Sequence, residues 1–113
     1  MRGDILKGHL DSLLLAVVAS GPAHGYAIIE TLCRRSGGAF DLPEGTIYPA
    51  LHRLERDGLL ASRWSGESGR RRRVYEITNS GRIALDLYRM EWRRFAEGVE
   101  AVFGEAEEPC PAT

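Results

Sequence analysis

A chain of 113 residues, with 43% apolar and 27% charged residues, has room for one folded domain with one core. A separate catalytic domain therefore does not fit. The longest apolar run covers residues 13–19, far fewer than the roughly 20 that a membrane-spanning helix needs. The first residues also lack the charged head, apolar stretch and cleavage site of a signal peptide. We expect a cytoplasmic protein that makes no membrane contact.

The formal net charge of −1 is distributed unevenly along the chain. Residues 34–73 carry a net charge of +4, whereas residues 74–113 carry −4. Attraction to a polyanion depends on the local patch rather than on the total charge. A nearly neutral chain can therefore still bind nucleic acid through its middle third.

A first helix is predicted before Gly21-Pro22, because glycine accepts a left-handed turn and proline cannot continue the hydrogen-bond ladder. Its apolar face consists of Leu6, Leu10, Leu13, Leu14, Val17 and Val18. A second helix opens at His24-Gly25-Tyr26 and ends at Ser36-Gly37-Gly38, with an apolar face made of Ile28, Ile29, Leu32 and Cys33. The tripeptide at 36–38 is the predicted turn of a helix-turn-helix unit.

A third helix follows a short extended piece at 39–42. Pro43 suits its first turn, where a missing amide donor costs little, and Gly58 suits its carboxyl cap. The inward stripe is predicted to be Ile47, Ala50, Leu51 and Leu54. The opposite side carries Thr46, Tyr48, Pro49, His52, Arg53 and Arg56. Pro49 predicts a kink, because proline inside a helix removes one hydrogen bond and crowds the preceding turn.

Two strands are predicted next, at Leu60 to Ser65 and Arg72 to Ile77, joined by the polar loop 66–69. Alternation at period two makes Trp64, Tyr75 and Ile77 available to face inward. The second strand is preceded and opened by four consecutive arginines, Arg70, Arg71, Arg72 and Arg73. Such a hairpin should protrude as a wing with an arginine-rich tip.

A long helix closes the chain, with Thr78-Asn79-Ser80 offering side chains to cap its first turn. Large apolar residues at a/d heptad spacing predict a seam for a second subunit: Leu85, Tyr88, Trp92, Phe95, Val99 and Val102. A second strip, Ile83, Leu87 and Met90, is expected to pack on the winged domain. The alternative is that the whole helix folds back on its own domain.

These elements predict a mainly α (α+β) fold, a winged helix-turn-helix with a long carboxyl-terminal dimerisation helix. We divide the chain into a winged-helix DNA-binding domain at 1–80, the dimerisation helix at 81–104 and an acidic tail at 105–113. The tail is rich in glutamate and proline, so we expect disorder there.

The segments LKGHLDSLLLAVVASGPAHGYAI, EGTIYPALHRLERDGLL and RRRRVYEITNSGR, followed by one long helix, resemble the PadR-like transcriptional regulators. The similarity covers roughly residues 5–103 and fits the small subfamily with a single carboxyl-terminal helix. It implies a bacterial homodimeric repressor that binds double-stranded operator DNA. In such proteins the third helix enters the major groove, the wing lies along the adjacent backbone or minor groove, and the last helix contacts the partner subunit.

Carried over by position, the resemblance places nine residues at or near DNA: Thr46, Tyr48, Pro49, His52, Arg53, Arg70, Arg71, Arg72 and Arg73. Arginine suits this role because it can bridge two acceptors on a guanine edge or clamp a phosphate. The alternatives are a solvated hairpin tip and helix-surface side chains that touch only water. At Glu76 this chain departs from many relatives, in which a basic residue often follows the strand tyrosine.

Trp92 matches a tryptophan that, in some drug-responsive relatives, is paired across the dimer axis and sandwiches flat aromatic ligands. Two facing tryptophans offer stacking surface and cation–π attraction to a planar cation. Trp92 is therefore a candidate effector residue, and the alternative is that it only fills the dimer seam.

No catalytic, cofactor or metal site is predicted, because His9, His24 and His52 lie in different elements and no His/Cys/Asp set has zinc spacing. Two hypotheses remain. One is a sequence-specific transcriptional regulator, expected to be a repressor released by a small-molecule or metal effector. The other is a winged helix that serves as a protein-interaction module without specific DNA binding.

Overall fold

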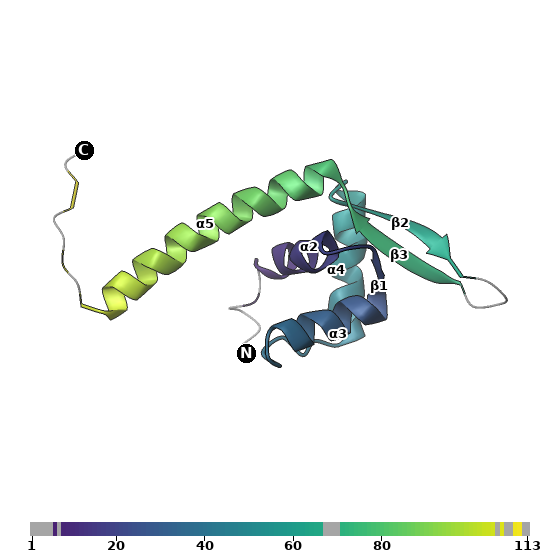
Figure 1. Cartoon of the computed structure of the whole chain (residues 1–113), viewed down its shortest axis with the longest axis horizontal. Coiled ribbons are helices and arrows are strands. Elements are labelled where there is room, and N and C mark those ends of the chain that lie inside the picture. Colours follow the sequence, from purple (N-terminus) through teal and green to yellow (C-terminus); the bar gives the residue numbers. More distant parts are fainter. Residues whose placement is uncertain (1–5, 7, 67–70, 106, 108–109, 112–113) are drawn as a thin grey trace.

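The computed structural model describes residues 6, 8–66, 71–105, 107 and 110–111 (Figure 1). Within them the chain forms four helices and a three-stranded antiparallel sheet. In chain order these are α2 (Leu10–Ala19), β1 (Ala23–His24), α3 (Gly25–Arg35), α4 (Glu44–Arg56), β2 (Leu60–Ser65), β3 (Arg72–Ile77) and α5 (Asn79–Phe103). The predicted mainly α fold, a winged helix-turn-helix followed by one long helix, is confirmed.

The core lies where α2, α3 and α4 meet the sheet and the first turns of α5. Each helix buries one stripe, and the stripe predicted for the third helix is confirmed, since all four of its residues are buried. The buried cluster consists of Leu14, Leu15, Val17, Val18, Ile28, Leu32, Ile47, Ala50, Leu51, Leu54, Leu60, Tyr75 and Leu85. Burial of these apolar side chains is the main force that holds the helices to the sheet.

Local signals set the helix ends. His24 caps α3, because its side chain accepts a hydrogen bond of 3.3 Å from the backbone N–H of Ala27. Pro43 lies at the amino-terminal cap of α4, one position earlier than the first turn predicted for it. Gly58, with a positive φ of 79°, follows the end of α4, as predicted. Pro49 lies inside α4, whose helical backbone continues from Glu44 to Arg56.

The hairpin of β2 and β3 forms the wing and has the predicted strand bounds. Leu60 pairs with Ile77, Ser62 with Tyr75, and Trp64 with Arg73. Tyr75 is buried, but Trp64 is 55% exposed, so the prediction that Trp64 faces inward is wrong. Trp64 lies on the same side of the hairpin as Tyr75, because paired residues share a face, yet at that point the strands have passed beyond the core.

The sequence did not predict the third strand, β1. Its two residues, Ala23 and His24, pair with Tyr75 and Val74 on the other edge of β3. A strand of two residues is too short to show alternation, so no pattern predicts it. Its pairing brings the start of α3 beside the wing.

The long helix α5 is tied to the winged unit at its first turn. The Thr78 hydroxyl donates a hydrogen bond of 2.7 Å to the Gly58 carbonyl oxygen and accepts one of 3.0 Å from the Gly81 N–H. A Cβ atom at Gly81 would overlap the carbonyl oxygen of Leu59, so this close approach requires glycine. The following turns of α5 pack beside α2, and its carboxyl-terminal half extends away from the other helices (Figure 1).

The orientation of α5 corrects one prediction. Ile83 is 70% exposed, and Leu87 and Met90 are also exposed, so the strip expected to pack on the winged domain faces away from it. Leu85, which the heptad pattern assigned to the dimer seam, is 3% exposed and lies in the core of its own chain. Helical geometry explains why Leu85 is buried while the other strip is exposed. Leu85 lies about 160° around the helix from both Ile83 and Leu87.

Candidate nucleic-acid interface

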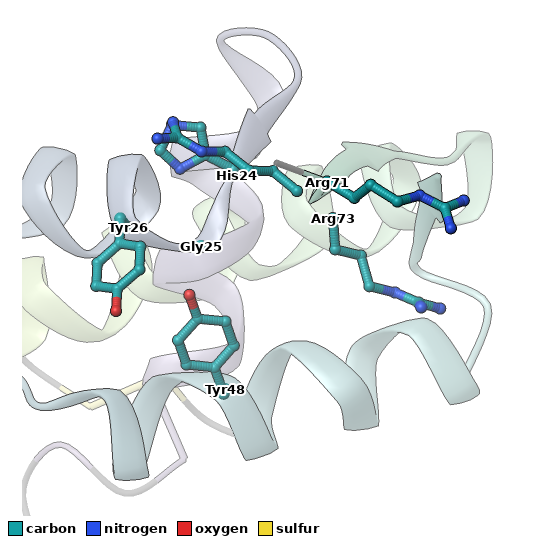
Figure 2. Close-up of a pocket in the computed structure, with 7 residues that line it drawn as sticks. His24, Gly25, Tyr26, Tyr48, Arg71 and Arg73 are labelled. Atoms are coloured by element: carbon teal, nitrogen blue, oxygen red, sulfur yellow. The ribbon is translucent and has the colours of Figure 1, made fainter. Parts of the chain in front are cut away.

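An open cleft of about 420 Å³ lies between the start of α3, the exposed side of α4 and the wing. Figure 2 shows Tyr48 pointing from α4 towards Gly25, while Arg71 and Arg73 extend from the wing. A Cβ atom at Gly25 would overlap the Tyr48 ring and hydroxyl, so glycine lets the two helices meet here. The cleft is lined by His24, Gly25, Tyr26, Tyr48, Arg71, Arg72 and Arg73.

His24 faces two hydrogen-bond donors. Its Nδ1 accepts from the Ala27 backbone N–H at 3.3 Å, and its Nε2 lies 3.1 Å from a terminal nitrogen of Arg72. A neutral imidazole that accepts at Nδ1 carries its hydrogen on Nε2. With the hydrogen on Nδ1 instead, Nε2 accepts from Arg72, and in either tautomer the guanidinium keeps other donors for an acceptor outside the protein.

Two tyrosine hydroxyls lie at this cleft, and both remain protonated at neutral pH. The pKa of Tyr48 is raised mainly by burial and secondarily by the charge of Glu44. The pKa of Tyr26 is raised mainly by a hydrogen bond with Glu44 and secondarily by the charge of that residue. The Tyr48 hydroxyl can therefore donate to an acceptor such as a phosphate oxygen, whereas the single hydrogen of the Tyr26 hydroxyl is directed to Glu44.

The predicted DNA-contacting residues of α4 lie on one side of that helix. Thr46, Pro49, His52 and Arg53 are exposed, and Tyr48 is half-buried. Arg53 also pairs with α2, because its Nε and one terminal nitrogen donate to the Asp11 carboxylate at 3.3 and 2.5 Å. This hydrogen bond is the main cause of the raised pKa of Arg53.

The wing arginines differ in their contacts, and Arg70 lies outside the described residues. Arg72 meets His24, as described above. Arg73 donates from Nε to the Ser62 hydroxyl at 2.8 Å and from a terminal nitrogen to the Glu55 carboxylate at 3.4 Å. Arg71 and Arg73 both lie over the Trp64 ring, at 5.5 and 5.3 Å from its centroid.

Sequence reasoning missed several residues of this surface. His24 ends β1 and Tyr26 lies in the first turn of α3, which the unpredicted pairing of β1 with β3 brings beside the wing. Asp11 and Glu55 hold the arginines of α4 and the wing, but carboxylates far apart in sequence give no signal of such pairing. The tripeptide His24-Gly25-Tyr26 lies within the first segment that resembles the PadR-like regulators, and this resemblance is the signal that could have indicated the site at the start of α3.

A second cavity, of about 580 Å³, lies between α2 and α5. His9 Nδ1 and the Tyr88 hydroxyl are 3.0 Å apart. The His9 and Trp92 rings form a T-shaped pair with a centroid distance of 5.6 Å. Trp92 is partly exposed at the rim. This aromatic cavity is lined by Leu6, His9, Leu13, Phe40, Tyr88, Trp92 and Phe95.

The predicted dimer seam divides into two parts. Leu85 and Tyr88 contact their own winged unit, the first in the core and the second through His9. Phe95 and Val102 are exposed, and Val99 is half-buried.

The described part of the chain contains no cluster of three metal-ligating His, Cys, Asp or Glu side chains. None of its helices combines the length and apolar character needed to cross a bilayer.

The sequence matches known proteins along most of its length. A profile described as the transcriptional regulator PadR-like family matches residues 14–87. An uncharacterized protein of Lysinibacillus sphaericus is 31% identical over 101 residues, covering 88% of this chain and 93% of that protein. A transcriptional regulator of Mycobacterium tuberculosis is 43% identical over 72 residues, which cover 64% of each chain.

Solved structures of transcriptional regulators also resemble the chain along most of its length. A transcriptional regulator from Clostridium thermocellum superposes with a TM-score of 0.80 at 28% identity, covering 87% of this chain and 96% of that one. A PadR family transcriptional regulator from Eggerthella lenta gives a TM-score of 0.79 at 30% identity, covering 92% and 88%. The chain therefore belongs to the PadR-like family of transcriptional regulators, with their winged helix-turn-helix fold.

Proposed function

We propose that this chain is a homodimeric bacterial repressor that acts in the cytoplasm and binds a specific operator through α4 and the wing. The single observation that carries the proposal is the convergence of three elements on one cleft. The start of α3, the exposed side of α4 and the wing together contribute two tyrosine hydroxyls, His24 and Arg71 to Arg73. Such a surface suits DNA, which requires positive charge for the backbone and a helix for the major groove.

The chemistry of the cleft supports a contact with the DNA backbone. His24 Nε2 and a terminal nitrogen of Arg72 lie 3.1 Å apart, and the Tyr48 hydroxyl lies on the opposite wall. A phosphate oxygen has several lone pairs and a negative charge, so it can accept from more than one of these groups. We assign this cleft to phosphate contact and positioning on the duplex.

Base recognition is assigned to the exposed side of α4. Thr46, His52 and Arg53 present donors there, and Pro49 offers a compact apolar surface. Asp11 engages two of the N–H donors of Arg53, which leaves other donors of the guanidinium for an acceptor on DNA. Arg53 would thus approach a base edge or a phosphate in an orientation set by α2.

A second copy is assigned to the far half of α5. Val102 and Phe103 are exposed there, beside the half-buried Val99, and the exposed Phe95, which also lines the aromatic cavity, continues this apolar stripe towards the winged unit. A two-fold pair of such chains would bring two α4 helices to one face of a duplex. Half-sites would then be roughly 34 to 36 Å apart, which is one turn of DNA.

Release by an effector is assigned to the aromatic cavity beside Trp92. Its aromatic walls fit a flat aromatic molecule, and His9 and Tyr88 supply polar groups at one side. An effector shifts the equilibrium only to the extent that it binds the released and DNA-bound states differently. The cavity lies between α2 and α5, so a ligand there would act on the angle between the winged unit and α5.

The test is binding of the purified protein to a labelled fragment from upstream of its own gene, titrated against salt and against a scrambled duplex. We expect steep salt dependence and affinity at least about a thousandfold above that for the scrambled duplex. Equal and weak binding to both duplexes would contradict sequence-specific recognition of that fragment. Failure to bind either duplex at low salt would favour the interaction-module hypothesis.

Replacing the wing arginines separates the two hypotheses. Substitution of Arg71, Arg72 and Arg73 by alanine should lower DNA affinity and flatten its salt dependence if the chain binds DNA. If the chain is instead a protein-interaction module, the same variant should retain partner binding through α5. The measurement is fluorescence anisotropy of labelled DNA over a series of salt concentrations.

A further inference from the structure

Trp64 lies at the part of the wing that extends past the core. Its side chain is 55% exposed, although tryptophan side chains are highly buried on average. The cross-strand neighbour of Trp64 is Arg73, and the guanidinium carbons of Arg71 and Arg73 lie 5.5 and 5.3 Å from the ring centroid. Both distances fall within the range of a cation–π contact.

Arg73 is also held by polar contacts to the other two elements of the wing base. It donates to the Ser62 hydroxyl on β2 and to the Glu55 carboxylate on α4, and Ser62 itself donates to Glu55 at 2.5 Å. These three bonds join α4 to both strands of the hairpin. Arg73 thus uses two of its nitrogens within the protein.

Arg71 lies nearer the tip and shares the same ring. A cation–π contact attracts the guanidinium to the aromatic face without using an N–H donor. Arg71 can therefore remain stacked on Trp64 while its N–H groups bind an acceptor outside the protein. A flexible arginine loses side-chain entropy when it binds a phosphate, and a preformed stack removes part of that cost in advance.

We propose that Trp64 is a positioning residue for DNA binding, which holds Arg71 ready to bind a backbone phosphate while Glu55 and Ser62 fix Arg73 as a structural arginine. This inference rests on the proposed function and adds a division of labour among the wing arginines. Trp64 raises affinity without contributing a charge. Its removal should therefore weaken binding, whereas removal of Arg71 should also eliminate one ionic contact.

The experiment compares Trp64→Leu, Trp64→Phe and Arg71→Gln with the unchanged protein. Leucine keeps an apolar side chain without a ring, and phenylalanine keeps an aromatic face. The probe is a labelled mixed-sequence duplex of about 30 base pairs at several low salt concentrations, since backbone binding requires no operator. Thermal unfolding of each variant checks that the fold is retained.

We expect Trp64→Leu to weaken binding about two- to fivefold, with the salt dependence of the unchanged protein. Arg71→Gln should reduce the slope of log K against log salt by about 0.9, the value for one phosphate contact. Trp64→Phe should restore most of the affinity that Trp64→Leu loses. The inference would be overturned if Trp64→Leu bound as tightly as the unchanged protein, or if Trp64→Phe bound as weakly as Trp64→Leu.

A measurement without DNA distinguishes failure of this inference from failure of the proposed function. In the free protein, stacking on Trp64 should shift the Arg71 side-chain δ protons upfield in the NMR spectrum, and Trp64→Leu should abolish that shift. Upfield shifts combined with no DNA binding by the unchanged protein would reject the proposed function and, with it, the role of Trp64 at DNA. Absence of the shift in a protein that binds DNA would reject only the positioning role.

Discussion

Arg53 on α4 and Asp11 on α2 are joined by two hydrogen bonds, 3.3 Å from Nε and 2.5 Å from a terminal nitrogen of the guanidinium. The pair links the helix assigned to base recognition with the helix that lines the aromatic cavity. Both side chains are about 40% exposed, so solvent screens the attraction and other acceptors can reach Arg53. The contact therefore serves to orient Arg53 more than to stabilise the fold.

Asp11→Asn is expected to lower the free energy of unfolding by less than about 1 kcal/mol, the usual size of an exposed ion pair. The same change removes a negative charge beside the surface assigned to DNA, so affinity for non-specific duplex should rise and discrimination should fall. Competition binding with specific and scrambled duplexes measures both effects. Asp86→Asn on α5 is the control, because its exposed carboxylate pairs only with Arg89 one turn away among the described residues. Unchanged discrimination in Asp11→Asn would contradict an orienting role.

Gly25→Ala should destabilise the protein by about 1 to 3 kcal/mol, because the new Cβ would overlap the Tyr48 ring and hydroxyl. Urea unfolding measures the loss. Tyr48→Ala combined with Gly25→Ala should recover much of it, since the two residues interact and their effects should not add. Gly45→Ala on α4 is the matched control: its Cβ would meet nothing within 4 Å, so this helical substitution should be neutral or stabilising.

Glu55→Gln should lower the free energy of unfolding by about 1 kcal/mol, because the carboxylate accepts from both Ser62 and Arg73. If the loss arises from this network, it should shrink when Arg73 is already replaced by glutamine. A double-mutant cycle in urea measures that coupling. Glu76→Gln, an exposed carboxylate on β3, provides the comparison, and equal losses at both positions would show that the network adds nothing.

Stability should fall at alkaline pH, because burial raises the pKa of Tyr75, with the charge of Glu55 as a smaller cause. The folded state then favours the protonated phenol more than the unfolded state does. This stabilisation is fully present below the unfolded pKa of about 10 and is lost as the pH rises through the higher folded pKa. Tyr75→Phe cannot ionise, so its stability should depend less on pH above about 10 in urea titrations. An unchanged pH profile in that variant would assign the alkaline loss to other groups.

Phe95→Asp is expected to convert a dimer into a monomer at micromolar concentration, because it places a charge on the exposed apolar stripe of α5. Sedimentation velocity distinguishes the two states. Glu97→Gln, on the same helix, should leave the dimer intact. A monomeric unchanged protein would exclude this interface altogether.

The helices and the two longer strands could be predicted because each carries a local signal. Gly58 and Thr78 mark helix ends through their own backbone or side-chain chemistry, and the strands at 60–65 and 72–77 alternate. Placement of single side chains depends on where the core ends, which no local pattern records. Trp64 has the correct register for the core but lies beyond it.

The face of α5 was ambiguous for a related reason. Its sequence contains two apolar strips, and periodicity alone does not say which one meets the winged unit. The close contact of Gly81 with Leu59 decides the matter, because it fixes the rotation of the helix and turns Leu85 inward. The pairs that hold the candidate site, Asp11 with Arg53 and Glu55 with Arg73, join residues that only the tertiary fold brings together.

The close contact at Gly81 anchors one end of the long helix α5 and leaves its other end far from the winged unit. The helix has 25 residues, so it is about 37 Å long, and its first turn is fastened to the chain segment that links α4 to the wing. At that length, a tilt of about 10° at the fastened end moves the other end by roughly 6 Å. Conversely, a displacement of the last turns would be transmitted to the first turn of α5, which is hydrogen-bonded to the segment between α4 and the wing.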